Sequence, residues 1–173
     1  MDIKSKIRTV PHWPIHGVMF RDITTLLQEP DVFKCVIDTL YERYKGKNIN
    51  KVVGIESRGF IFGAVLAYRL NAGFVPVRKK GKLPYKTIKE EFEKEYGKDM
   101  VEIHLDSIKK GENVLIIDDL IATGGTISAT IRLVEKLGGN IVECSFVIGL
   151  PDLKGMEKLK GYKIFSLINF EGE

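Results

Sequence analysis

Residues 114–126 read Val-Leu-Ile-Ile-Asp-Asp-Leu-Ile-Ala-Thr-Gly-Gly-Thr, and this stretch decides the fold. Its continuous run of branched apolar residues predicts a strand buried on both faces, which is typical of a parallel sheet covered by helices. The glycines that follow predict a turn, and the apolar spacing after them predicts a helix over about 127–137, closed by Gly138-Gly139. The stretch is therefore a strand–turn–helix unit of an α/β domain.

The same pattern appears elsewhere in the chain. Short apolar runs end in polar or glycine-rich turns, and some of these turns lead into segments with helical spacing of apolar residues. We expect further strands at 52–55, 74–77 and 141–150, and further helices at 60–70 and 31–44. The 173 residues fit one domain, with a mostly parallel central sheet flanked by helices.

Two regions do not follow this strand–turn–helix pattern. Residues 100–106 alternate between apolar and polar, which predicts a half-exposed strand. Residues 78–96 are densely charged, and they form a connection of about twenty residues with little apolar anchorage. Connections of this length usually serve as lids or binding loops. We therefore expect a functional loop here.

Charge and composition exclude several classes of protein. The net charge is +4, but six bases and no acid lie between residues 78 and 89, so the rest of the chain has a net charge of −2. This local surplus argues against nucleic-acid binding. No apolar run approaches the roughly 18 residues of a membrane span, and the charged N-terminus does not resemble a signal peptide. The two cysteines lack metal-ligand or redox-pair spacing, which favours a cytoplasmic protein with free thiols.

The stretch at 114–126 also predicts a ligand site. Its strand carries Asp118 and Asp119 to the carboxyl edge of the sheet, where open α/β sheets bind ligands. The small residues that follow allow backbone N–H groups to approach an anion, and the next helix points its N-terminus at the same place. No two of the 17 glycines are separated by a single residue, which excludes a dinucleotide-binding fingerprint. We expect a monophosphate cradle formed by Ala122, Thr123, Gly124, Gly125 and Thr126, with sugar hydroxyls at Asp118 and Asp119.

Residues 114–126 resemble the phosphoribosyl-diphosphate motif of the type I phosphoribosyltransferases. Four other segments, at 17–23, 56–63, 78–84 and 95–98, are similar to the adenine phosphoribosyltransferases in order and spacing. The resemblance extends from about Ile7 to Phe170. It implies the type I phosphoribosyltransferase fold as a single domain over 1–173, with a small N-terminal hood over about 1–30 and a flexible catalytic loop over about 78–100.

The resemblance implies transfer of 5-phosphoribosyl from phosphoribosyl diphosphate to N9 of adenine, which gives AMP and diphosphate and serves purine salvage. It also implies Mg²⁺, held mainly through substrate oxygens and water rather than by a protein cage. The departing diphosphate needs cations, and the turn at residues 56–58 is similar to one that contains a non-proline cis peptide. The residues implied for the diphosphate are Glu56, Ser57, Arg58, Arg78, Lys79 and Lys82.

The remaining implied residues concern the base and its protonation. Met19, Phe20 and Arg21 would contact adenine, whereas the residues alone favour ordinary core for the first two. Glu95 would donate a proton or polarise the base near N7, Tyr96 would cover the closed site, and Arg58 would also serve catalysis. Without the resemblance, Glu95 would pass for a solvated charge, and Arg132 with Lys136 looks like a solvated helix face.

Two alternatives are open at this point. A transferase for hypoxanthine or guanine would share the phosphate site, but the segments at 17–22 and 95–96 disfavour it. A regulator that senses phosphoribosyl diphosphate and binds DNA would need a basic helical domain, and only about sixteen residues precede the hood motif. Members of the family are generally homodimers, so we expect a homodimer with no nucleic-acid or membrane partner.

Overall fold

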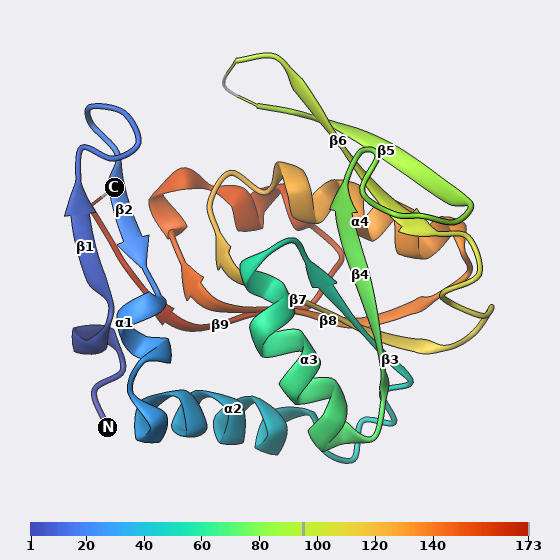
Figure 1. The fold of residues 1–173 in the computed structure, drawn as a ribbon, viewed down its shortest axis with the longest axis horizontal. Helices are drawn as coiled ribbons and strands as arrows, with labels where there is room; N and C mark the ends of the chain where they lie inside the picture. The colour runs from blue at the N-terminus through green and yellow to red at the C-terminus, as the bar shows by residue number, and fades with distance from the viewer. Residues whose placement is uncertain (95, 173) are drawn as a thin grey trace.

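A computed structural model describes residues 1–94 and 96–172, and its centre is a seven-stranded sheet in the order β5-β6-β4-β3-β7-β8-β9. The five strands from β4 to β9 in this order are parallel, and β6 and β5 add an antiparallel edge. The parallel strands are β4 (Gly73–Lys79), β3 (Lys51–Ile55), β7 (Asn113–Ile121), β8 (Asn140–Gly149) and β9 (Ile164–Asn169). The predicted mostly parallel sheet is confirmed (Figure 1).

Three helices cover the sheet. Apolar side chains of α2 (Pro30–Tyr44) and α3 (Arg58–Leu70) share one core with one face of the strands, and those of α4 (Gly125–Lys136) share another core with the opposite face. Strands β3, β7 and β8 are buried along most of their length because both faces are covered, which explains their continuous apolar runs. No helix among the described residues is long and apolar enough to cross a membrane.

The predicted elements need three corrections. Strand β7 continues to Ile121, so Asp118 and Asp119 lie inside the strand rather than after it. The second half of the connection at 78–96 contains a strand, β5 (Thr87–Glu93), which pairs along its whole length with β6 (Lys98–His104). Its backbone is thus hydrogen-bonded although its side chains are charged. The flexibility of this segment stays a prediction.

The expected strand at 100–106 is present as β6, with Val101 and Ile103 buried as predicted, but the alternation fails at two positions. Glu102 is only 8% exposed, whereas Leu105, beyond the strand, is 48% exposed. Strand β6 lies between β4 and β5, and Glu102 accepts a hydrogen bond of 3.3 Å from the backbone N–H of Gly81. This hydrogen bond gives the buried carboxylate a partner, and it links β6 to the turn that follows β4.

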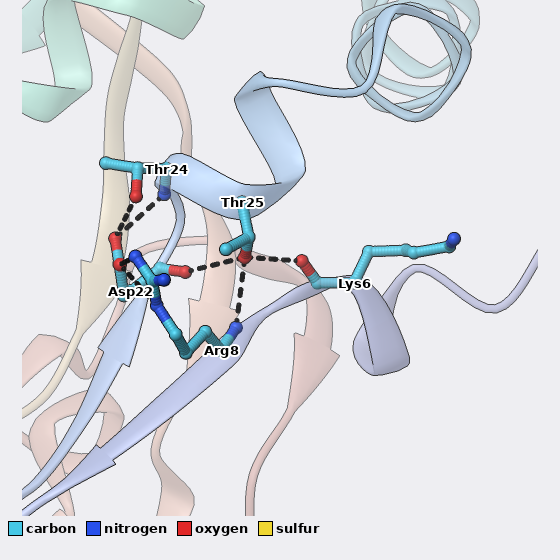
Figure 2. A network of polar contacts seen from close by, with 5 residues as sticks. All are labelled: Lys6, Arg8, Asp22, Thr24 and Thr25. Carbon is cyan, nitrogen blue, oxygen red and sulfur yellow. Dashed lines mark hydrogen bonds and ion pairs between the residues drawn. The ribbon is translucent and has the colours of Figure 1, made fainter.

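The N-terminal hood is a separate two-stranded antiparallel sheet beside the main one. It consists of a 3-10 helix (Lys4–Lys6), β1 (Arg8–Pro11), β2 (Met19–Asp22) and α1 (Thr24–Leu27). Figure 2 shows the polar contacts that join these pieces: Asp22 accepts hydrogen bonds from Arg8 and Thr24, and the Thr25 hydroxyl joins Lys6 to Arg8. The bonds from Thr24 and Arg8 lower the pKa of Asp22 to about 2. The hood is thus braced by an ionised carboxylate.

The hood and the β5–β6 hairpin stand at opposite ends of the sheet (Figure 1). The Arg21 guanidinium lies 4.2 Å from the ring centre of Phe170, just after β9, which places the hood at that edge. Strand β5 forms the other edge. The carboxyl ends of the central parallel strands lie between these two structures.

Candidate active site

Segments that follow three neighbouring strands meet at the carboxyl edge of the sheet. Strands β4, β3 and β7 are adjacent and parallel, so the basic segment, the turn at 56–58 and the loop at 122–124 emerge side by side. The basic segment and the turn at 56–58, together with Asp118 and Thr126, surround a cavity of about 230 Å³. Six of the predicted site residues line this cavity: Glu56, Arg58, Arg78, Lys79, Asp118 and Thr126.

The predicted phosphate cradle forms a second cavity, of about 200 Å³, which is lined by all five residues from Ala122 to Thr126. Gly124 has a φ of +82°, a conformation that side-chain-bearing residues rarely adopt, and it allows the chain to turn directly into α4 at Gly125. The first N–H groups of a helix lack intrahelical partners and attract anions. Asp118 and Thr126 line both cavities, so the two are neighbours.

The outer wall of the cradle is a segment that the sequence analysis did not identify. Gly155 begins the second of two 3-10 helices, Pro151–Leu153 and Gly155–Leu159. A Cβ atom at Gly155 would lie 2.2 Å from the Ala122 carbonyl oxygen, and one at Gly124 would lie 2.7 Å from the Gly155 carbonyl oxygen. Backbone therefore packs directly on backbone here. An isolated glycine after a charged run carries no sequence signal for this contact.

The two acids of β7 have different surroundings. Asp119 is 3% exposed and accepts a hydrogen bond of 2.5 Å from Nε of Arg58. Asp118 faces the cavity, and burial together with the neighbouring Asp119 carboxylate raises its pKa well above the ordinary value. Helix α3 can approach these acids because a Cβ at Gly59 would lie only 2.9 Å from Asp118 Oδ1. The sequence predicted the same role for Asp118 and Asp119. In the structure their surroundings differ, because Asp119 is ion-paired with Arg58 whereas Asp118 lines the cavity.

Glu56 organises the cations of the basic segment. Its carboxylate accepts hydrogen bonds from Lys82 Nζ at 2.7 Å, from the Lys79 backbone N–H at 2.8 Å and from Arg78 Nη2 at 3.2 Å. Burial opposes ionisation, but these bonds prevail and lower the pKa of Glu56 to about 2. The peptide bond between Glu56 and Ser57 is cis, as the family resemblance implied. Ser57 itself is exposed, and its side chain makes no capping hydrogen bond to α3.

The hood contacts Arg58, a residue of the cavity wall, through Phe20. The Arg58 guanidinium lies 5.7 Å from the ring centre of Phe20, and the Trp13 ring meets Phe20 edge-on at 4.5 Å. Met19 is half-buried beside it on β2. The Arg21 side chain turns back into the hood, where it donates to the Thr9 hydroxyl at 2.6 Å. The Arg21 side chain is thus engaged within the hood, and its backbone, in β2, is the part suited to contact a ligand.

The β5–β6 hairpin contributes further residues to the 230 Å³ cavity, from the side opposite the hood. Phe92, Lys94 and Asp99 line the 230 Å³ cavity, and none of them was predicted, although Phe92 is the one apolar side chain in a run of charges. Tyr96 is 86% exposed. Glu95 lies outside the described residues, so its predicted role is untested.

Comparison with known proteins agrees with this geometry. The family model described as the phosphoribosyl transferase domain matches residues 22–172. The fold and the site thus define a type I phosphoribosyltransferase.

Three similar proteins narrow this class. The chain is 65% identical to the adenine phosphoribosyltransferase of Desulfosudis oleivorans over 100% of both chains. It is 48% identical to the crystal structure of that enzyme from Thermoanaerobacter pseudethanolicus, with a TM-score of 0.95 over 98% of both chains. It is 43% identical to the Saccharomyces cerevisiae enzyme solved with an imino-altritol bisphosphate and adenine, with a TM-score of 0.91 over 96% of this chain and 97% of that one. The chain belongs to the adenine phosphoribosyltransferase family.

Proposed function

We propose that the protein transfers the 5-phosphoribosyl group of phosphoribosyl diphosphate to N9 of adenine, forming AMP and diphosphate in purine salvage. One observation carries the proposal: a phosphate cradle and a cation-lined cavity adjoin and share Asp118 and Thr126. A substrate with a monophosphate at one end, a diphosphate at the other and a sugar between them matches these two neighbouring cavities.

The cradle suits the 5-phosphate. Its glycines permit close backbone approach, and α4 directs its N-terminal N–H groups at the anion. The hydroxyls of Thr123 and Thr126 add donors. Asp118, which faces both cavities, and Asp119, which is held by Arg58, would then accept hydrogen bonds from the ribose hydroxyls. The two carboxylates would repel a nearby phosphate, but the hydrogen bonds that they accept from the sugar hydroxyls would offset this repulsion.

The cation-lined cavity suits the diphosphate leaving group. Departure of diphosphate leaves a positively charged, oxocarbenium-like sugar, so stabilising the leaving charge should matter more than activating the nucleophile. Arg58, Arg78, Lys79 and Lys82 supply positive charge, with Glu56 holding the last three in place and Ser57 offering its backbone N–H. Nε of Arg78 is buried and has no hydrogen-bond partner in the described part of the chain, so it is a donor suited to a phosphate oxygen.

The base would lie between hood and hairpin. Met19 and Phe20 offer apolar contact with the purine ring, and the Arg21 backbone offers hydrogen bonds to its edge. The S. cerevisiae relative solved with adenine supports a base site in this fold. Glu95 would approach N7, where it would take up the proton that adenine loses as N9 attacks the sugar and would donate that proton in the reverse reaction. The exposed Tyr96 would cover the closed site.

The reaction also needs Mg²⁺, and the residues present fit that ion. No group of three or more His, Cys, Asp and Glu side chains in the described ranges could hold a metal by itself. Asp118 and Asp119 provide hard oxygen donors beside the ribose position, which suits an ion that takes most of its ligands from substrate and water. When bound, Mg²⁺ would neutralise charge on the diphosphate.

We further propose that the protein acts in the cytoplasm as a homodimer. Both cysteines, Cys35 and Cys144, are free thiols, which fits a reducing compartment. Helix α3, which starts at the site, exposes Ile61 and Tyr68, and these side chains suit a subunit contact. Light scattering on the purified protein tests the dimer, and a monomer at micromolar concentration would contradict it.

The activity is tested by mixing the protein with Mg²⁺, phosphoribosyl diphosphate and one nucleobase at a time while diphosphate release is followed. Adenine should support turnover, and hypoxanthine and guanine should support much less. Absence of turnover with adenine, or faster turnover with hypoxanthine, would contradict the proposal.

A further inference from the structure

Strand β5 is fastened to helix α4 mainly through the side chain of Arg132. The Arg132 guanidinium donates to the Glu90 carboxylate from Nε at 2.9 Å and to the Glu91 carbonyl from Nη2 at 2.8 Å. Its Nη1 donates to the Ser128 hydroxyl, one helical turn earlier, at 3.0 Å. All three donor nitrogens are therefore used, and the planar guanidinium sets the position of β5 relative to the helix.

The contact has a second cation. Lys136, four residues after Arg132, also pairs with Glu90, whose side chain is only 15% exposed. Hydrogen bonds from Lys136 and Arg132 lower the pKa of Glu90, so the carboxylate is ionised at neutral pH. Although both cations are partly exposed, a carboxylate that is largely covered and is bound by two cations contributes more than an isolated surface pair.

The strand that Arg132 holds reaches the active site two residues further on. Phe92 lines the 230 Å³ cavity together with Arg58 and Thr126. A Cβ at Gly125 would lie 3.2 Å from the Glu93 carbonyl oxygen and 3.2 Å from Cδ2 of Phe92, so the strand rests on the first residue of α4. The position of β5 thus decides the position of one cavity wall relative to the phosphate cradle.

We propose that Arg132 is a positioning residue for the transfer reaction: by holding β5 on α4, it sets the height of the hairpin over the bound substrate. This inference rests on the proposed function, in which the base lies between hood and hairpin and Tyr96 covers the closed site. Helix α4 would then contribute to the site in two ways. Its first turn would bind the phosphate, and Arg132 in its third turn would hold β5, which carries the cavity wall at Phe92.

The first test measures docking of the hairpin without substrate or turnover. Trypsin cleavage after Lys89, Lys94 and Lys98 should be about 10-fold faster in Arg132→Met, because the strand opens more often once its contacts are lost. Arg69→Met is the matched control, since Arg69 pairs with Asp38 between α2 and α3, away from the hairpin. Its cleavage in this segment should equal that of the parent protein.

The second test is kinetic. Arg132→Met should lower kcat/KM for adenine by roughly 10- to 100-fold, as expected when a reacting group is displaced by about 1 Å. Arg132→Lys, which keeps a charge near Glu90 but loses the planar set of donors, should recover part of both losses. Affinity for phosphoribosyl diphosphate should change less than kcat.

Any of the following outcomes would contradict the proposal. Equal cleavage in Arg132→Met and the parent would show that the contact does not fasten the hairpin. Faster cleavage with unchanged kinetics would show that its position is unimportant for transfer, and equal losses in Arg69→Met would mean general destabilisation. Because cleavage is measured without substrate, it tests the fastening even if adenine proves to be the wrong base.

Discussion

Glu56 is the residue on which the cations of the site depend, and its ionisation predicts a pH-dependent stability. The pKa falls from 4.5 to about 2 on folding, which corresponds to about 3 kcal/mol of stability. Because the folded pKa is the lower one, this stabilisation is complete above pH 4.5 and is lost as the pH falls toward 2. Glu56→Gln should therefore reduce the free energy of unfolding at pH 7 by up to about 3 kcal/mol.

Chemical denaturation of Glu56→Gln and the parent at pH 7, 4 and 3 checks this prediction. The difference between the two proteins should shrink as the pH falls. A difference that is the same at all three values would mean that the charge of Glu56 contributes nothing to the effect.

Glu95 gives the second prediction for a single side chain. Glu95→Gln should lower kcat by about 10²–10⁴, the usual effect of removing a positioned acid or base, and should barely change the affinity for phosphoribosyl diphosphate. Glu91→Gln is the matched control on the same hairpin, since that carboxylate makes only a long, exposed contact of 3.8 Å with Lys98. Full activity of Glu95→Gln in the steady-state assay would refute the proton-transfer role.

Among the elements, the short 3-10 helix at Gly155–Leu159 is tested through its contact with the cradle. Gly155→Ala would place a Cβ 2.2 Å from the Ala122 carbonyl oxygen. Because both partners are backbone, the helix or the cradle must move, at a cost of about 1–3 kcal/mol of stability. We expect the KM for phosphoribosyl diphosphate to rise more than kcat falls, since the cradle holds the phosphate before and during transfer.

Steady-state kinetics with each substrate varied in turn measures this effect. Lys160→Ala is the control, because Lys160 ends the same 3-10 helix and is exposed. An unchanged KM in Gly155→Ala would show that the wall of the cradle tolerates the displacement.

At the scale of the whole molecule, two cores support the sheet from opposite faces while the site lies at the carboxyl ends of its strands. Arg43 on α2 bonds Glu143 on β8 twice, at 2.8 Å each, and the Glu143 side chain is only 4% exposed. Arg43→Met would leave a buried carboxylate without its partner, which costs about 3 kcal/mol. For a chain of this size, Tm should fall by about 6–12 °C.

Activity at 25 °C should stay within about twofold of the parent, since the variant remains folded there. The double variant Arg43→Met with Glu143→Met should recover most of the lost Tm, because an apolar pair replaces the ion pair. Calorimetry and the activity assay together test this. A large loss of activity in folded Arg43→Met would show that this ion pair is coupled to the site.

The sheet and the turn that leads into α4 could be predicted because their causes are local. Continuous apolar runs predict the buried strands β3, β7 and β8, and the glycine turn before α4 predicts the anion site within one strand–turn–helix unit. The hairpin could not be predicted in this way. Strand β5 carries charges on a backbone paired with β6, and a charged run without an apolar face indicates a loop when its partner strand is unknown.

By itself, the sequence determined the α/β fold, the position of the glycine turn before α4 and the family, since these depend on residues close together in the chain. Only the tertiary structure decided the pairing of charges, because the partners are distant in sequence. Glu56 meets Lys82 across 26 residues, Arg58 meets Asp119 across 61, and Arg132 meets Glu90 across 42. Each of these side chains suits a solvated surface when considered alone, whereas folding covers the three carboxylates and brings a cation to each of them.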